Sequence, residues 1–83
     1  MSSPKRKLSQ KEIQWLREFG KRVRQARQAR QWTLEEMEEH GWPSWQHLQQ
    51  VETGQKNINL TTLIRLLDLL KLDPAIALKG FRI

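Results

Sequence analysis

Residues 33–54 read TLEEMEEHGWPSWQHLQQVETG, and the fold prediction rests on the helix starts and ends in this stretch. Thr33 is a favourable N-cap, because its side chain can accept a hydrogen bond from the first turn of a helix, where two glutamates follow it. The helix that begins here is predicted to end at Gly41, since glycine readily adopts the left-handed conformation of a helix cap. Pro43 cannot continue it.

A second short helix follows almost directly. Ser44 caps it, and it is predicted over 45–53, with Leu48 and Val51 facing inward and Gly54 ending it. Its outward positions are rich in glutamine amides. Two short helices joined by a tight turn that contains a glycine describe a helix-turn-helix.

The flanking segments complete an all-α chain of five helices. Ser9, with a glutamate three residues later, forms a capping box that opens a long helix at about 10–30. Apolar residues recur along that helix at gaps of three and four, and Gly20 is a weak point inside it. Two further helices are predicted over 59–70 and 73–78, each behind a capping residue.

The length and composition set bounds on the class of protein. A chain of 83 residues allows one small domain, here 9–83 with the helix-turn-helix at about 33–53, behind a flexible basic arm, 1–8. The absence of cysteine excludes disulfides and thiol catalysis. No apolar run reaches the roughly 20 residues that span a bilayer. We expect a cytoplasmic, nucleoid-associated protein.

The charge is distributed unevenly along the chain. The formal net charge is +6, which is typical of a protein with a polyanionic partner. Residues 1–31 carry ten basic and two acidic side chains, whereas residues 32–54 carry five glutamates and neither Lys nor Arg. Residues 55–83 are basic again. We therefore expect the first and last thirds to hold a polyanion, and the middle third to contribute something other than positive charge.

Four short motifs follow one another at a characteristic spacing. They are Val23-Arg24-x-x-Arg27, Thr33-Leu34-Glu35-Glu36-Met37, Leu48-x-x-Val51-Glu52-Thr53-Gly54-Gln55-Lys56-Asn57 and Leu60-x-x-Leu63-Ile64-x-Leu66. With these motifs, residues 19–78 resemble the Cro and phage-repressor helix-turn-helix family, also called the XRE family. The resemblance implies a five-helix lambda-repressor-like fold with a long first helix. It also implies a small sequence-specific transcriptional regulator, a repressor that binds a near-palindromic operator in double-stranded DNA as a homodimer.

The family's DNA contacts map onto positions of this chain. The helix after Pro43 would be the recognition helix in the major groove, where a glutamine amide can pair with adenine and a tryptophan can pack on a thymine methyl. The implied base contacts are Ser44, Trp45, Gln46, Gln49 and Gln50. The implied phosphate contacts are Thr33, Arg24, Lys56 and Asn57. Arg27 and Glu52 match a structural ion pair of the family.

Each of these positions also has a simpler interpretation. The glutamines can be an ordinary solvated helix face, and Trp45 can pack on the protein instead of on DNA. The basic face of Arg17, Lys21 and Arg24 can be solvated rather than clamped on phosphate. The arm at 5–7 can wrap DNA or merely aid solubility.

The alternative function is a protein-interaction module on the same fold, such as an antitoxin-like or adaptor protein, favoured by the acidic segment 32–54. No catalytic site is expected, because no nucleophile accompanies the paired glutamates. We also expect no cofactor, no metal and no small-molecule ligand. His40 and His47 are interpreted as surface or packed histidines, since no zinc-binding pattern surrounds them.

The sequence departs from the family at the turn. Leu34 replaces a phosphate-binding glutamine, and Glu38 replaces the small residue at the closest approach of the two short helices. Trp42 stands where the turn glycine usually falls. We therefore expect a rebuilt turn, in which Gly41 caps the first short helix, Trp42 packs inward and Glu38 turns to solvent.

The helix over 59–70 departs as well, because leucines and Ile64 surround nearly all of it. A helix that is apolar all round is expected to be buried all round. Either the long first helix, with Trp15 and Phe19, covers it, or a second copy of the chain does. Further exposed apolar surface is expected from Ile76, Leu78, Phe81 and Ile83. We prefer a homodimer through the C-terminal helices.

Overall fold

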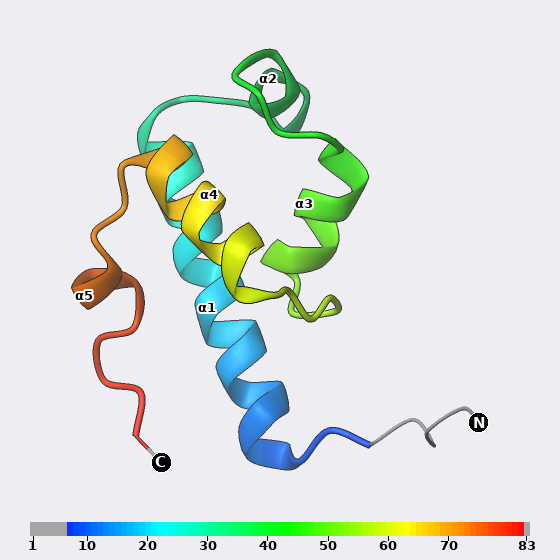
Figure 1. The fold of residues 1–83 in the computed structure, drawn as a ribbon, viewed down its shortest axis with the longest axis vertical. Helices are drawn as coiled ribbons and strands as arrows, with labels where there is room; N and C mark the ends of the chain where they lie inside the picture. The colour runs from blue at the N-terminus through cyan, green and yellow to red at the C-terminus, as the bar shows by residue number, and fades with distance from the viewer. Residues whose placement is uncertain (1–6, 83) are drawn as a thin grey trace.

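The computed structural model describes residues 7–82, which form five α-helices and no strand (Figure 1). Residues 1–6 of the predicted arm at 1–8 lie outside the described residues, as does Ile83. The all-α, five-helix prediction is confirmed. The helices are α1 (Gln10–Ala29), α2 (Leu34–Glu39), α3 (Trp45–Glu52), α4 (Leu60–Leu70) and α5 (Pro74–Ala77). Their N-caps are the predicted residues Ser9, Thr33, Ser44, Asn59 and Asp73.

The long helix α1 is the spine of the molecule (Figure 1). α3 packs on α1 and on α2, and α5 returns to lie against α1. The core takes one fully buried large side chain from each of the first four helices: Val23, Met37, Leu48 and Leu66. Burying one such side chain contributes roughly 1.5–3 kcal/mol to the free energy of folding. All four helices therefore contribute to the stability of the core.

Gly20 marks the closest approach of α1 to α3. A Cβ atom at this position would lie 2.3 Å from the carbonyl oxygen of Val51 and 2.6 Å from that of Glu52. Glycine has a low helix propensity, but at this position it allows the backbones of α1 and α3 to touch. Only glycine leaves room for that contact.

Four helices end in the same way, with a left-handed residue directly after the helix or as its cap. Gly41 ends α2 with φ +112°, and Gly54 ends α3 with φ +76°. Gln31 behind α1 and Lys71 behind α4 adopt φ 61° and 52° without being glycine. At each of these ends a further N–H reaches back to a carbonyl of the last turn, as Trp42 does to Met37 at 2.9 Å.

Two arginines of α1 bind the C-terminal helices. The Arg22 guanidinium donates to the carbonyl oxygens of Ile76 and Ala77 at 3.3 and 3.1 Å, and Arg30 donates to the carbonyl of Leu70 at 2.9 Å. These contacts satisfy carbonyls in the last turns of α5 and α4. The two side chains therefore help to hold the C-terminal helices against α1.

Of the two expected ways to cover α4, the long helix α1 does not cover its outer side. Leu66, Leu67 and Leu70 are buried, but Leu60 is 69% exposed and Ile64 58% exposed. The buried leucines belong to the core cluster, whereas Leu60 and Ile64 face away from it.

The C-terminal segment differs from its prediction at one residue. Ile76 and Leu78 are exposed, as expected. Phe81 is not, because its ring packs on Trp15 with 5.0 Å between the ring centroids, and the Arg22 guanidinium lies 4.8 Å above it. Trp15 therefore packs on Phe81, and it borders the same hollow as Leu63 of α4.

Candidate nucleic-acid interface

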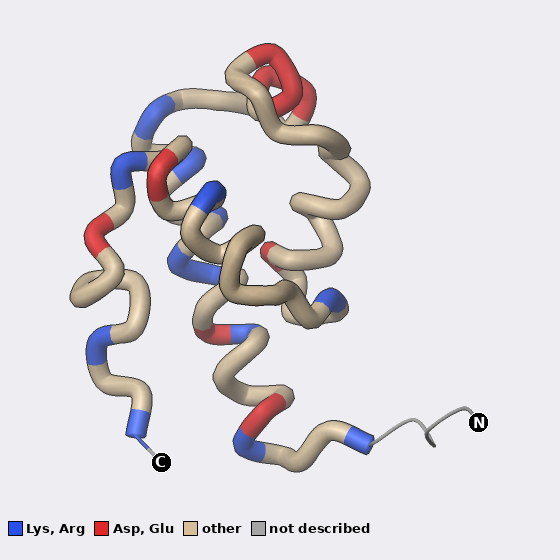
Figure 2. Tube along the Cα trace, in the orientation of Figure 1, with Lys and Arg blue, Asp and Glu red and all other residues tan. Residues whose placement is uncertain are grey.

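Helix α3 has one buried face and one exposed polar face. Leu48 and Val51 are 0% and 2% exposed and point into the core. The side chains of Gln46, Gln49 and Gln50 are exposed and border one shallow hollow on the outside of the helix. Figure 2 shows that α3 carries no charged residue until Glu52 at its end. The exposed face can therefore offer amide donors and acceptors without a net charge.

The N-terminus of α3 is held by two side chains. The Ser44 hydroxyl accepts from the backbone N–H of His47 at 3.3 Å and donates to Oε1 of Gln46 at 3.1 Å. The backbone N–H of Trp45 donates to Oε2 of Glu38 at 2.7 Å. Ser44 and Trp45 are both half-buried, so the Trp45 ring is neither fully packed nor fully free.

The turn between α2 and α3 is rebuilt as the sequence predicts. Gly41 has a positive φ behind α2, and Trp42 is 4% exposed in the core. Glu38 is exposed, but its carboxylate caps α3 instead of lying free in water. Sequence reasoning missed this second role, and a carboxylate seven residues before the first residue of the helix is no recognised capping signal.

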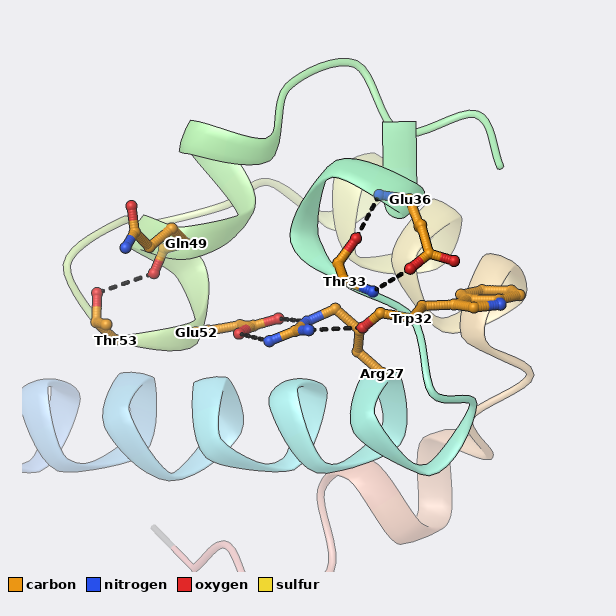
Figure 3. Close-up of polar contacts among 7 residues, drawn as sticks. All are labelled: Arg27, Trp32, Thr33, Glu36, Gln49, Glu52 and Thr53. Atoms are coloured by element: carbon orange, nitrogen blue, oxygen red, sulfur yellow. Dashed lines mark hydrogen bonds and ion pairs between the residues drawn. The ribbon is translucent and has the colours of Figure 1, made fainter. Parts of the chain in front are cut away.

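A buried ion pair ties α1 to the end of α3 (Figure 3). Arg27 binds Glu52 through two parallel contacts, Nε to Oε2 at 2.7 Å and Nη2 to Oε1 at 3.0 Å. Its remaining nitrogen, Nη1, donates to the carbonyl of Trp32 at 2.7 Å. The hydrogen bond from Glu52 raises the pKa of Arg27 above its ordinary value, although burial opposes this effect. The pair fixes where the recognition-helix candidate ends.

Thr33 stands at the N-terminus of α2 in a capping box (Figure 3). Its hydroxyl accepts from the backbone N–H of Glu36 at 3.1 Å, and its own N–H donates to the Glu36 carboxylate at 3.1 Å. The hydroxyl hydrogen takes no part in the box, so the hydroxyl can still donate to an acceptor such as a phosphate. The N–H itself is already engaged.

The other predicted phosphate contacts lie on two separate segments. Lys56 and Asn57 are exposed in the loop behind α3, and Arg24 is exposed on α1. Arg17 lies two turns before Arg24 on the same helix face and packs against the end of α3, since a Cβ at Gly54 would meet its Cγ at 2.7 Å. This basic face of α1 therefore borders the loop that carries Lys56.

The two histidines are engaged with aromatic rings. His40 stacks on Trp32 with 3.8 Å between ring centroids, and His47 lies beside Trp42 at 5.9 Å. Within residues 7–82, no cluster of three or more His, Asp or Glu side chains is placed to hold a metal ion. No helix in the same part of the chain has the length and apolar character to cross a membrane.

Two short helices at a tight turn, the second with a buried apolar face and an exposed polar one, define a helix-turn-helix domain. The family model described as "Helix-turn-helix domain" matches residues 18–77, and the chain belongs to this family. The match is consistent with the Cro and phage-repressor type. No curated protein and no solved structure matches the chain significantly.

Proposed function

We propose that the protein is a sequence-specific transcriptional regulator of the Cro and phage-repressor type, with α3 as its recognition helix in the major groove. The observation that carries the proposal is the exposed glutamine face of α3. Gln46, Gln49 and Gln50 stand on a helix whose opposite face is locked into the core, so their amides are presented by a rigid support. Glutamine amides match the donor and acceptor pattern of adenine.

The remaining contacts are proposed around this face. Ser44 and Trp45 would meet base edges from the N-terminus of α3, with Trp45 suited to a thymine methyl. Phosphates would be held by the Thr33 hydroxyl and by the exposed side chains of Arg24, Lys56 and Asn57. Because α3 has no Lys or Arg, its base contacts are neutral, and we expect groove shape to contribute to specificity.

We propose further that the regulator is a homodimeric repressor acting by occupancy of a near-palindromic operator at the nucleoid, in the cytoplasm. The proposal is supported by exposed apolar residues on the C-terminal helices, which a second copy could cover: Leu60 and Ile64 on α4, and Ile76 and Leu78 at α5. A two-fold dimer would present two recognition helices about 34 Å apart. Sedimentation at micromolar concentration tests this part, and a monomer there would refute it.

A protein-interaction module is the second candidate. The observation that favours it is the acidic surface of α2, where Glu35, Glu38 and Glu39 are exposed (Figure 2). Among residues 7–82, none of these three carboxylates forms an ion pair with Lys or Arg. Such a surface repels phosphate and would suit a basic partner protein.

In vitro selection from a random duplex pool separates the two functions. The regulator predicts enrichment of one sequence with two related half-sites, bound with an affinity that falls steeply as salt rises, at a log–log slope of about −0.9 per phosphate contacted. No enrichment, or binding that is indifferent to salt, would refute the regulator and leave the interaction module.

A further inference from the structure

A cleft of about 700 Å³ lies between the turn that precedes α3 and the helix α4. Its apolar surface comes from Trp42 and Pro43 on the turn and from Leu69 on α4. The volume falls within the range of small-molecule sites, roughly 300–1,000 Å³. The cleft shares no residue with the hollow along the glutamine face, so an occupant would not block those side chains.

Two residues that border the cleft, Trp42 and His47, each carry a buried polar atom without a partner in the part of the chain that the structure describes. Nε1 of Trp42 and Nδ1 of His47 are both buried, and neither has a hydrogen-bond partner within the described residues. The whole Trp42 side chain is 4% exposed. Both atoms are covered by protein, so they are not offered directly to an occupant of the cleft.

Arg65 stands at the same cleft with an unpaired guanidinium. It is exposed, and no hydrogen bond or ion pair joins it to the rest of residues 7–82. Three arginines of α1, by contrast, bind carbonyls or carboxylates of the protein. Asp68 also borders the cleft, but its Oδ1 pairs with Nζ of Lys71 at 3.7 Å and not with Arg65. The cleft thus combines an apolar floor with an available planar cation.

We propose that this cleft is a binding site for a small organic carboxylate with a flat apolar body. The carboxylate would pair with the Arg65 guanidinium, whose fork of donors matches its two oxygens. The apolar body would lie on Trp42, Pro43 and Leu69. A uniformly apolar ligand would leave the arginine unused, and an inorganic anion would leave the floor uncovered, so the donor set favours a molecule with both parts.

The site adjoins the start of α3. Ser44, which caps that helix, is one of the residues that border the cleft. An occupant would therefore contact the turn that sets the position of α3. The binding claim does not depend on the proposed function, because it is measured on the protein alone.

Nuclear magnetic resonance titration of the full chain with benzoate tests the proposal, with benzamide as the neutral probe of the same shape. The indole N–H signal of Trp42 reports on a side chain that borders the cleft, once it is assigned among the four tryptophans by a Trp42→Phe variant. We expect saturable shifts of this signal and of the amides of 41–44 with benzoate. The affinity should fall about tenfold for benzamide and for Arg65→Gln, and stay unchanged for the exposed control Lys79→Gln.

Three results would overturn the proposal. The first is no saturable shift with benzoate, which would mean that the cleft holds water only. The second is equal affinity for benzamide, and the third is unchanged affinity in Arg65→Gln. Thr62→Phe, which places a ring in the cleft, should abolish binding. If the chain fails to select any DNA sequence while benzoate still binds, the regulator is refuted and the carboxylate site stands.

Discussion

The carboxylate of Glu38 on α2 accepts the backbone N–H of Trp45, the first residue of α3, at 2.7 Å. This contact crosses the turn and supplies one of the unpaired N–H groups of α3 with an acceptor. It also places a negative charge at the positive end of that helix, which is a favourable arrangement. Glu38, a charged residue at a position where two helices pack closely, therefore helps to orient α3.

Replacing Glu38 with alanine should lower the free energy of unfolding by about 1 kcal/mol, the usual cost of losing a helix cap. Glu38→Gln keeps an acceptor but loses the charge, so its loss should be smaller. Urea denaturation measures both. Glu39→Ala, at an exposed neighbour without such a contact, is the control and should change stability by less than about 0.5 kcal/mol. Equal losses at the two positions would show that the cap contributes nothing.

Gly20→Ala should destabilise the protein even though alanine is the better helix former. Helix propensity alone predicts a gain of about 1 kcal/mol. The added methyl group would lie 2.3 Å from the Val51 carbonyl oxygen, and forcing α1 away from α3 should cost roughly 1–3 kcal/mol. Thermal unfolding measures the sign, with Gln25→Ala on the exposed face of α1 as the matched control. A Gly20→Ala variant more stable than the parent would contradict the close approach.

Removing one partner of the buried ion pair should lower the free energy of unfolding far more than removing both partners. Glu52→Met leaves Arg27 charged and buried, which typically costs about 3–5 kcal/mol. The double variant Arg27→Met with Glu52→Met should be more stable than Glu52→Met alone. Because Glu52 raises the pKa of Arg27, the arginine loses its charge only as pH rises beyond its ordinary value, so its contribution is constant near neutral pH. Chemical denaturation of the parent, the single variant and the double variant measures their free energies of unfolding. A double variant less stable than Glu52→Met would contradict this expectation.

Introducing a glycine behind one helix should raise the stability of the protein, whereas removing the glycine at the equivalent position behind another should lower it. Lys71 adopts φ 52° behind α4, so Lys71→Gly should stabilise the chain by about 0.5–1 kcal/mol. Gly41 has φ +112° with open space where a Cβ would stand, so Gly41→Ala should destabilise it by backbone strain alone, by about 1 kcal/mol. Differential scanning calorimetry compares the two. A loss of stability in both variants would show that the left-handed conformation at Lys71 is not strained.

The sequence predicts what is encoded locally. Each helix start is announced by its capping residue, and the inward turn of Trp42 follows from the glycine beside it. Contacts between distant segments have no such signal. Nothing near Arg30 indicates that it reaches the Leu70 carbonyl 40 residues away, and Gly20 has the same local context whether or not a backbone passes over it.

In the candidate site, too, the locally encoded features could be predicted and the contacts between distant segments could not. The outward position of the three glutamines follows from helical periodicity, because Leu48 and Val51 fix the inward face. The Glu38 cap and the cleft beside Arg65 depend on how α2, α3 and α4 meet, and periodicity does not determine that.

If the glutamine amides of α3 read base edges, their removal should matter on one duplex sequence and not on another, which affinity measurements on two duplexes determine. Gln46→Ala and Gln50→Ala should each weaken binding to the selected sequence by about 1–3 kcal/mol and leave binding to a scrambled duplex unchanged. Lys56→Ala should weaken both duplexes alike, because a phosphate contact carries no sequence information. Gln28→Ala, at an exposed position of α1, is the control. Equal losses on both duplexes for the α3 variants, or no loss on either, would contradict the account.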